Sequence, residues 1–252
     1  MHSKELGEGD PLILIHGWGM NAKIWDRVES GLSKNYALII VNFPGMGGCK
    51  NINNYSMESL VDELDLLVPN NSSIVGWSLG GQLAIAYQKK YPKKVKKLIL
   101  LSTTPCFINK SGWDYGIKEV IFDKFSKQLI LNWRATIEQF LLLQLHGLPN
   151  MRKATKDLQH EMFKLGEPEP NALINSLELL KKNDLRHDLC KISVSTLIIS
   201  GGRDKIVPVD ASVYMYENVP GATLEIFENA NHIPFLTETQ RFVDTVQSFI
   251  NS

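Results

Sequence analysis

Short apolar runs recur along the chain, and each is bounded by glycine, proline or polar residues. These runs are rich in Ile, Leu and Val and lack strict polar alternation, a pattern typical of strands buried on both faces of a parallel sheet. The predicted strands cover residues 12–15, 37–41, 73–75, 97–101, 196–200 and 223–227. Segments of helical period cover residues 56–67, 79–91 and 237–250. Strands that alternate with helices predict an α/β fold with a mostly parallel central sheet flanked by helices.

The alternation of strand and helix signals stops between residues 107 and 186, where aromatic residues and leucines recur at helical intervals. Because this stretch follows one predicted strand and precedes another, it should lie above the carboxyl edge of the sheet, where open α/β sheets bind ligands. We therefore predict a core formed by residues 1–106 and 187–252, with residues 107–186 inserted as a helical lid. Glycine and proline at residues 147–150 and 166–168 predict turns within this lid.

The composition fits a soluble protein with a full core. The chain has 252 residues, 44% of them hydrophobic, which is enough for one large domain. Its 27 basic residues balance its 27 acidic residues, which argues against a protein that coats nucleic acid or an anionic membrane. Three scattered cysteines, Cys49, Cys106 and Cys190, indicate neither a zinc site nor a disulfide framework and favour a reducing compartment. The first apolar run, at residues 12–15, is too short for a signal peptide or a membrane span, so we expect a cytoplasmic protein.

The sequence Gly-Trp-Ser-Leu-Gly at residues 76–80 matches the G-x-S-x-G nucleophile elbow, with a predicted strand before it and a predicted helix after it. A sharp strand-to-helix turn strains the backbone of Ser78 and exposes its hydroxyl, and small residues must flank it. The new helix also points its positive N-terminal end at an oxyanion formed there. Ser78 is therefore our candidate nucleophile. The alternative is a glycine-rich turn that only lets the helix pack on its strand.

A serine hydroxyl needs a base to become a nucleophile, and six histidines are available. His232 follows the last predicted strand in a loop, where the base of such a hydrolase reaches the sheet edge, so we select it. His16 is interpreted as a structural residue below the oxyanion site, and His2 as part of a floppy terminus. The remaining histidines, expected to be solvated or helix-capping, are His146, His160 and His187.

The histidine in turn needs an acid that fixes its tautomer. Asp204 follows the predicted strand at residues 196–200 and gives the chain order Ser, Asp, His expected for this kind of triad. Asp210 is the alternative acid, although capping of the following helix explains it equally well, and a turn role is the alternative for Asp204. The oxyanion should be bound by two backbone amides, that of Leu79 and that of Trp18 in the loop His-Gly-Trp-Gly.

Distinctive stretches of sequence run nearly from end to end of the chain. They are HGWGMNA at residues 16–22 with Trp25, GWSLGG at 76–81, PCF at 105–107, FLLLQ at 140–144, LELL at 177–180, DLR at 184–186 and the loops of Asp204 and His232. These stretches resemble the α/β-hydrolase esterases, and within them the esterases that act on the methyl ester of pimeloyl-[acyl-carrier protein] in biotin synthesis. The tryptophans and the FLLLQ stretch identify this group of esterases far more specifically than the G-x-S-x-G pattern alone.

The resemblance implies an α/β-hydrolase fold and a serine carboxylesterase that needs no metal and no cofactor. Its substrate would be acyl carrier protein bearing a pimeloyl methyl ester, and its products methanol and pimeloyl-[acyl-carrier protein]. The substrate-binding residues that it implies are Trp18, Ser78, Leu79, Phe140, Leu141, Leu142, Leu143, Gln144 and His232. Two other functions stay open: a broad short-chain esterase or carbon–carbon bond hydrolase of the same fold, and a ligand receptor built on it.

The charge of the predicted lid bears on the carrier protein. Residues 124–164 hold seven basic and three acidic side chains, a local net charge of +4 in a neutral chain. Such a surface would attract an acidic carrier. The family's basic carrier contacts match Arg152 and Lys156, with Arg134 as a substitute for two positions that are uncharged here. We expect a monomer without nucleic acid or membrane partners, and solubility explains the lysines at residues 89–97.

Overall fold

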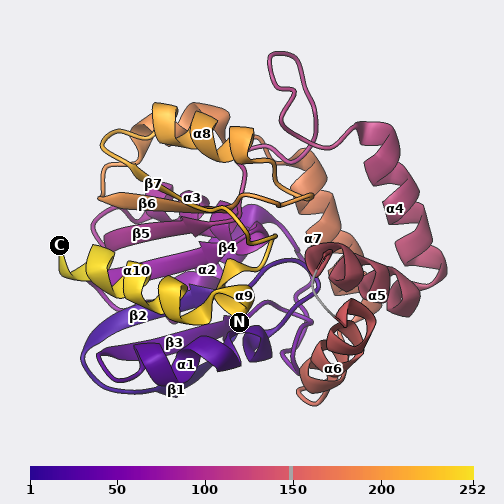
Figure 1. Ribbon diagram of the computed structural model, residues 1–252, viewed down its shortest axis with the longest axis horizontal. Helices are drawn as coiled ribbons and strands as arrows, with labels where there is room; N and C mark the ends of the chain where they lie inside the picture. Colours follow the sequence, from indigo (N-terminus) through magenta and orange to yellow (C-terminus); the bar gives the residue numbers. More distant parts are fainter. Residues whose placement is uncertain (148–149) are drawn as a thin grey trace.

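A seven-stranded, mostly parallel sheet forms the centre of the molecule (Figure 1). The computed structural model describes residues 1–147 and 150–252. The strands are β1 His2–Leu6, β2 Asp10–Ile15, β3 Tyr36–Asn42, β4 Ser72–Trp77, β5 Val95–Leu101, β6 Thr196–Gly201 and β7 Thr223–Phe227. Their order is β1-β3-β2-β4-β5-β6-β7; β1 is antiparallel to β3, and the other neighbours are parallel. The predicted α/β fold is confirmed.

Each of the six predicted strands lies within an observed one, but the edge strand β1 was not predicted. The interpretation of His2 as part of a floppy terminus is wrong, because His2 pairs with Asn42 of β3. The side chains of β1 are exposed or half-buried, so backbone hydrogen bonds rather than burial hold it at the sheet edge. A strand of this kind leaves no apolar run in the sequence from which it could be predicted.

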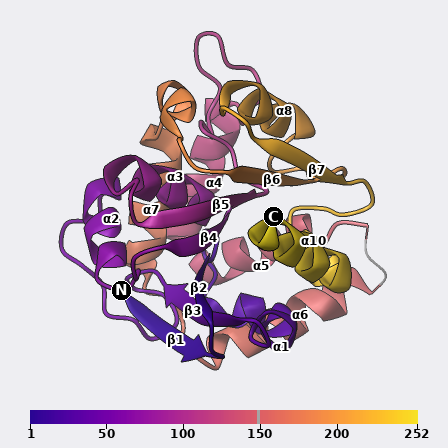
Figure 2. The ribbon, with the colours of Figure 1, turned by 90° about the vertical axis from the view of Figure 1, so that its left-hand side faces the viewer.

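Helices cover both faces of the sheet (Figure 2). On one face lie α2 Met57–Asp65 and α3 Leu79–Lys90, and on the other lie α1 Asp26–Leu32 and α10 Thr239–Asn251. The remaining core elements are η1 Ala22–Trp25, η2 Arg186–Lys191, α8 Val209–Asn218, which packs against β6 and β7, and α9 Pro234–Thr237. The predicted helices at residues 56–67, 79–91 and 237–250 correspond to α2, α3 and α10.

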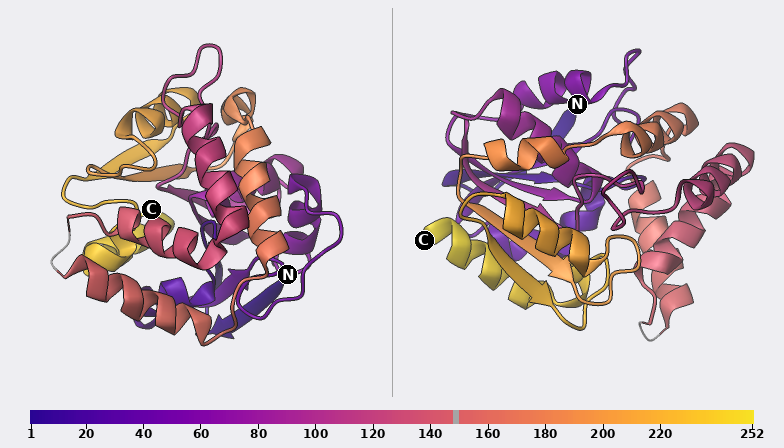
Figure 3. Two further views of the ribbon diagram at one scale, coloured as in Figure 1. Left: turned by 90° about the vertical axis from the view of Figure 1, so that its right-hand side faces the viewer. Right: turned by 90° about the horizontal axis from the view of Figure 1, so that it is seen from above.

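Four further helices lie between β5 and β6 in the chain and gather at one end of the sheet (Figures 1 and 3). They are α4 Glu119–Leu131, α5 Trp133–Gln144, α6 Met151–Phe163 and α7 Pro170–Lys182. All four fall within residues 107–186, which we call the helical insertion. The predicted turn at residues 166–168 lies between α6 and α7. The predicted turn at residues 147–150 includes residues 148 and 149, which lie outside the described residues.

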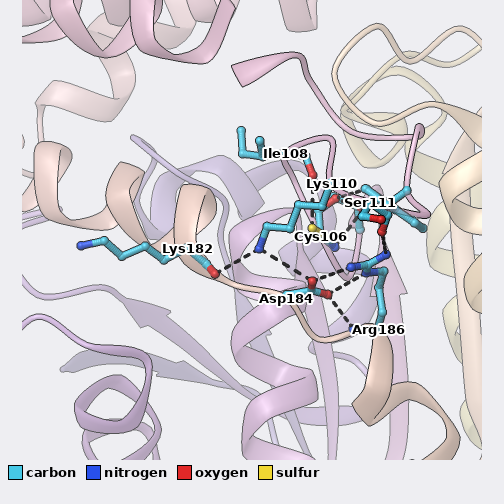
Figure 4. Close-up of polar contacts among 9 residues, drawn as sticks. Cys106, Ile108, Lys110, Ser111, Lys182, Asp184 and Arg186 are labelled. Atoms are coloured by element: carbon cyan, nitrogen blue, oxygen red, sulfur yellow. Dashed lines mark hydrogen bonds and ion pairs between the residues drawn. The ribbon is translucent and has the colours of Figure 1, made fainter. Parts of the chain in front are cut away.

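The chain segments that enter and leave the helical insertion are joined at its base (Figure 4). The Leu185 amide donates to the Pro105 carbonyl at 2.8 Å, and Cys106 pairs with Asp184 in a β-bridge. The Arg186 guanidinium donates to both oxygens of the Asp184 carboxylate, at 2.8 and 2.7 Å, and lowers the pKa of that carboxyl to about 2. Backbone and side chain together therefore fix where the insertion starts and ends on the core.

Two properties of the surface bear on possible partners. Four of the lysines at residues 89–97 are paired with carboxylates: Lys89 with Asp188, Lys90 with Asp62, Lys94 with Asp65 and Lys96 with Asp10. These ion pairs account for four of the six lysines in this segment. In the part of the chain that the structure describes, no helix combines the length and the apolar character needed to span a bilayer.

Candidate active site

Ser78 lies at the sharp turn between β4 and α3. Its backbone has φ 55° and ψ −117°, a region that residues with a side chain adopt only under strain. Two hydrogen bonds hold the turn: the Ser78 amide donates to the Leu101 carbonyl at 3.0 Å, and the Thr103 hydroxyl donates to the Ser78 carbonyl at 2.6 Å. Strain that the surroundings hold in place is typical of functional sites, and here it lies at the predicted nucleophile.

The glycines of the elbow are required by close backbone packing. A Cβ atom on Gly76 would lie 2.4 Å from the Gly80 carbonyl oxygen, and one on Gly80 would lie 2.4 Å from the Ile15 carbonyl oxygen. Both separations are far shorter than van der Waals contact. Any side chain at either position would therefore push the helix away from the strands and displace Ser78.

His232 and Asp204 form a buried pair. His232 Nδ1 and Asp204 Oδ2 are 2.7 Å apart, and both side chains are almost fully buried. The other carboxylate oxygen of Asp204 accepts from the amides of Ile206 at 2.7 Å and Val207 at 3.0 Å, so the carboxylate cannot rotate freely. Asp210 is instead exposed in the first turn of α8. The structure thus brings Asp204, and not Asp210, to the histidine.

The hydrogen bond to Asp204 determines which nitrogen of His232 can act as a base. A carboxylate accepts the proton of Nδ1, which leaves a lone pair on Nε2. Among the described residues, Nε2 has no hydrogen-bond partner although it is buried. The bond from a catalytic base to its nucleophile is often long without substrate and shortens when substrate binds. The tautomer of His232 is therefore the one that general-base catalysis needs.

The predicted oxyanion loop lies directly against the elbow. A Cβ atom on Gly17 would lie 3.2 Å from the Cβ of Ser78, so the glycine lets the loop approach the nucleophile. Among the described residues, neither the Trp18 amide nor the Leu79 amide donates to a protein acceptor. The Trp18 indole donates to the Leu173 carbonyl of α7 at 3.0 Å, which ties the loop to the helical insertion. This arrangement is compatible with two amides that bind an oxyanion.

His16 is buried below this loop and is bonded on both ring nitrogens. Its Nε2 accepts from the Phe43 amide at 3.2 Å, so Nδ1 carries the proton and donates to the Gly17 carbonyl at 2.7 Å. Burial lowers the pKa of the His16 imidazole from 6.5 to about 4, although the Gly17 carbonyl opposes this shift. His16 is therefore neutral at physiological pH and supports the loop, as a structural residue would.

The depressed pKa of His16 predicts a pH dependence of stability. Between pH 6.5 and about 4 the unfolded chain binds a proton on this imidazole that the folded protein does not bind. As the pH is lowered through this range, the free energy of unfolding should therefore decrease by about 1.4 kcal/mol per pH unit more in the wild type than in the non-titrating variant His16→Gln. Urea denaturation at a series of pH values measures both profiles.

The exposed residue His187 provides the matched control for this experiment. The variant His187→Gln should retain the steep dependence of the wild type. Parallel profiles for the wild type and His16→Gln would show that the buried imidazole does not contribute, and would contradict the assignment of a neutral His16.

An apolar cavity of about 120 Å³ adjoins Ser78. Its lining residues come from the oxyanion loop, the nucleophile elbow, the helical insertion and the loop after β6: Trp18, Ser78, Phe107, Ile117, Ile121, Phe122, Phe125, Phe140, Leu143, Leu177, Leu180 and Ile206. Of the five residues predicted at 140–144, Phe140 and Leu143 line it. Leu141 and Gln144 are buried elsewhere on α5, and Leu142 lies in an outer groove beside Arg152.

Most of the cavity wall was missed by sequence reasoning. Phe122 and Phe125 stand three residues apart on α4, a spacing that places both on one face of a helix. That spacing was visible in the sequence, but it indicated only a helix with a buried face. Which cavity this face lines depends on how α4 packs over the sheet, and no local pattern in the sequence indicates that packing.

The three predicted carrier contacts lie in different environments. Arg152 and Lys156 are exposed on α6 and line an outer groove. Arg134 is instead paired with Glu167, and its guanidinium lies 4.3 Å from the centre of the Trp133 ring. Arg152 and Lys156 are therefore exposed to an approaching partner, although Glu138 and Asp157 line the same groove, whereas the charge of Arg134 is paired.

Comparisons with known proteins agree with this geometry. Residues 10–239 match the family described as alpha/beta hydrolase fold. The pimeloyl-[acyl-carrier protein] methyl ester esterase of Aliivibrio fischeri (strain MJ11) is 33% identical over 97% of this chain and 95% of its own. An esterase from Exiguobacterium antarcticum has a TM-score of 0.92 and 27% identity, over 100% of this chain and 95% of that chain. A meta-cleavage product hydrolase from Pseudomonas fluorescens IP01 shares the fold. It has a TM-score of 0.77 and 24% identity, over 99% of this chain and 93% of that chain.

Proposed function

This chain belongs to the α/β-hydrolase family, and from that premise we propose that it is a serine esterase that hydrolyses the methyl ester of pimeloyl-[acyl-carrier protein]. The observation that carries the proposal is the buried 2.7 Å contact between His232 Nδ1 and Asp204 Oδ2, which joins the loops after β7 and β6. The His232 loop is in turn hydrogen-bonded to Trp77, which directly precedes the strained Ser78. The curated relative from Aliivibrio fischeri, which bears this activity in its name, supports the choice of substrate.

The first half of the reaction forms an acyl-enzyme. The Ser78 hydroxyl attacks the carbonyl carbon of the methyl ester while His232 Nε2 removes its proton. The negative charge that develops on the carbonyl oxygen is stabilised by the amides of Trp18 and Leu79. His232 then gives its proton to the leaving oxygen, the carbon–oxygen bond to the methoxy group breaks, and methanol departs.

The second half returns the enzyme to its starting state. A water molecule gives a proton to His232 Nε2 and attacks the acyl carbon, and the bond to the Ser78 oxygen breaks as the proton returns to that oxygen. The products are pimeloyl-[acyl-carrier protein] and free enzyme. Asp204 orients the imidazole and stabilises the imidazolium that forms in both halves of the reaction.

The cavity favours a neutral ester over a free acid. Apart from the Ser78 hydroxyl, its lining consists of aliphatic and aromatic side chains, which suit a hydrocarbon chain. A methyl ester enters such a cavity without loss of charge solvation, whereas a carboxylate would lose the water around it at a considerable free-energy cost. The product acid is therefore expected to leave readily, and a free dicarboxylic acid is not expected to bind.

The proposal is tested by comparing two substrates that share the ester and differ in the carrier. Purified enzyme should show a much higher kcat/KM for methyl pimeloyl-[acyl-carrier protein] than for dimethyl pimelate. The advantage should shrink as salt is added, because charge attraction between enzyme and carrier is screened. Equal kcat/KM values for the two substrates at low salt would contradict the carrier-linked substrate and favour a broad short-chain esterase.

We propose that Arg152 and Lys156 attract the carrier protein, which predicts the effect of reversing their charge. The double variant Arg152→Glu and Lys156→Glu should lower kcat/KM for the carrier substrate by roughly 10- to 100-fold, because like charges then face each other across the interface. Hydrolysis of a p-nitrophenyl ester should not change. Steady-state kinetics with both substrates measures the difference.

The control for this variant places the same charge reversal at the amino ends of the parallel strands, opposite the carboxyl ends where the helical insertion lies. Lys34 and Lys93 are exposed and precede β3 and β5, so Lys34→Glu with Lys93→Glu changes the net charge equally but far from α6. The control should retain most of the carrier activity. Equal losses in the two double variants would show that net charge rather than the α6 surface matters.

A further inference from the structure

Trp77 links the nucleophile elbow to the histidine loop. It directly precedes Ser78, at the end of β4, and its side chain is 1% exposed. The indole Nε1 donates to the His232 carbonyl oxygen at 2.9 Å, a buried hydrogen bond between residues 155 positions apart in the chain. The indole and imidazole ring centres are 5.5 Å apart, so the two side chains are also near neighbours.

The same indole supports the oxyanion loop. A Cβ atom on Gly17 would lie 3.1 Å from Cε3 of Trp77, so the loop backbone packs directly against the indole. The Trp77 ring also meets Phe235, just beyond the histidine loop, with ring centres 5.2 Å apart. One side chain therefore contacts both the loop that would bind the oxyanion and the loop that carries the base, while its own backbone leads into the nucleophile.

We infer that Trp77 is a positioning residue for this reaction, and that its indole N–H holds the His232 backbone so that the imidazole stays in register with Ser78. This inference rests on the proposed triad. Catalysis depends steeply on such register, because a displacement of about 1 Å at a reacting group can cost about 100-fold in rate. The indole is suited to the task because it is rigid and donates one hydrogen bond in a fixed direction.

Packing alone does not account for the hydrogen bond. Trp25 belongs to the same aromatic cluster, with its ring centre 6.4 Å from that of Trp77 and 4.5 Å from that of Phe235, and it is equally buried. Among the described residues, however, the Trp25 indole nitrogen has no hydrogen-bond partner. The cluster therefore accommodates an indole for its shape alone, and the bond from Trp77 to His232 is an additional feature.

The test compares Trp77→Phe with two matched controls. Trp25→Phe changes a buried tryptophan of the same cluster without removing a hydrogen bond. Trp113→Phe removes a similar buried bond, because the Trp113 indole donates to the Cys106 carbonyl at 2.8 Å near the base of the helical insertion. With a p-nitrophenyl ester, kcat should fall about 10- to 100-fold in Trp77→Phe with KM little changed, and less than about threefold in each control.

Two readouts separate positioning from a general loss of structure. Titration with a fluorophosphonate should still label all Ser78 sites of Trp77→Phe, only more slowly. In an Asp204→Asn background, where the imidazole is already misaligned, adding Trp77→Phe should cost less than about threefold. If the two losses instead multiply in full, or if Trp77→Phe is as active as Trp25→Phe, the inference is overturned.

A second variant covers the case in which Trp77→Phe fails to fold. Incorporation of 3-benzothienyl-L-alanine at position 77 keeps the bicyclic shape but lacks the N–H donor, and it should show the same loss of kcat. Normal activity of this protein would overturn the inference. The p-nitrophenyl ester keeps the two proposals distinguishable: an active wild type that ignores the carrier substrate contradicts only the substrate, whereas an unlabelled wild type contradicts the triad.

Discussion

Ser78→Ala is expected to lower kcat by about 10⁶-fold and to abolish covalent labelling by a fluorophosphonate. The reason is that the hydroxyl oxygen at the strained elbow forms the bond of the acyl-enzyme, and no water molecule is held in the same position between the base and the ester. Labelling followed by intact mass spectrometry gives one adduct per wild-type molecule and none for the variant.

Ser102 offers a matched control for this experiment. It is another buried serine with a positive φ, of 41°, and it directly follows β5, the neighbour of β4 in the sheet. Ser102→Ala should label as the wild type does. Labelling that persists in Ser78→Ala would contradict the nucleophile, and a wild type that never labels would favour a ligand receptor on this fold.

Asp204→Asn is expected to lower kcat by about 10⁴-fold while the protein stays folded. One carboxylate oxygen accepts from the amides of Ile206 and Val207, so the oxygen of an asparagine would remain there. Its NH₂ group would then face His232 Nδ1, which would have to accept a hydrogen bond and move its proton to Nε2. The imidazole would be held in the tautomer that cannot act as a base.

Steady-state kinetics and thermal unfolding of the same preparations measure this effect. Asp210→Asn is the control, because Asp210 is exposed on α8, and it should remain close to the wild type in both measurements. Near-normal turnover of Asp204→Asn would contradict the assignment of the acid. A large loss of thermal stability would instead show that the carboxylate mainly holds its loop.

The sheet and the elbow could be predicted because their signals are local. A strand buried on both faces is apolar over most of its length, so β2 to β6 each contain a short apolar run. The elbow needs small residues wherever backbone segments are in close contact, and for this reason glycine stands at positions 76 and 80. Asp204 and His232 could be selected because each follows a strand whose carboxyl end must lie at the same edge of the sheet.

Features that depend on tertiary contacts could not be predicted in the same way. The edge strand β1 is held by backbone pairing with β3, which leaves no pattern of side chains. The pairing of Arg134 with Glu167 joins residues 33 positions apart, and no local spacing indicates it. The role of Trp77 likewise depends on a hydrogen bond to a backbone carbonyl far along the chain.

Helix geometry explains why only some residues of the predicted acyl-binding stretch line the cavity. Successive residues of a helix point about 100° apart, so five consecutive side chains cannot all face one cavity. On α5 the cavity receives Phe140 and Leu143, which are three residues apart and share a face. Leu142 points to the outer groove with Arg152 and Lys156. A linear motif therefore identifies the helix that contributes to a site, while the fold selects which of its residues line it.

The most direct test is to identify the covalent intermediate formed with methyl pimeloyl-[acyl-carrier protein]. Enzyme and substrate are mixed, quenched in acid within the first turnover and examined by intact mass spectrometry, with Ser78→Ala as the control. Attack on the methyl ester predicts one species with the mass of enzyme plus carrier substrate less methanol, its linkage mapped to Ser78 and missing from the variant. An enzyme that carries only a methyl pimeloyl group, formed by attack on the carrier thioester, or an adduct on another residue, would contradict the account.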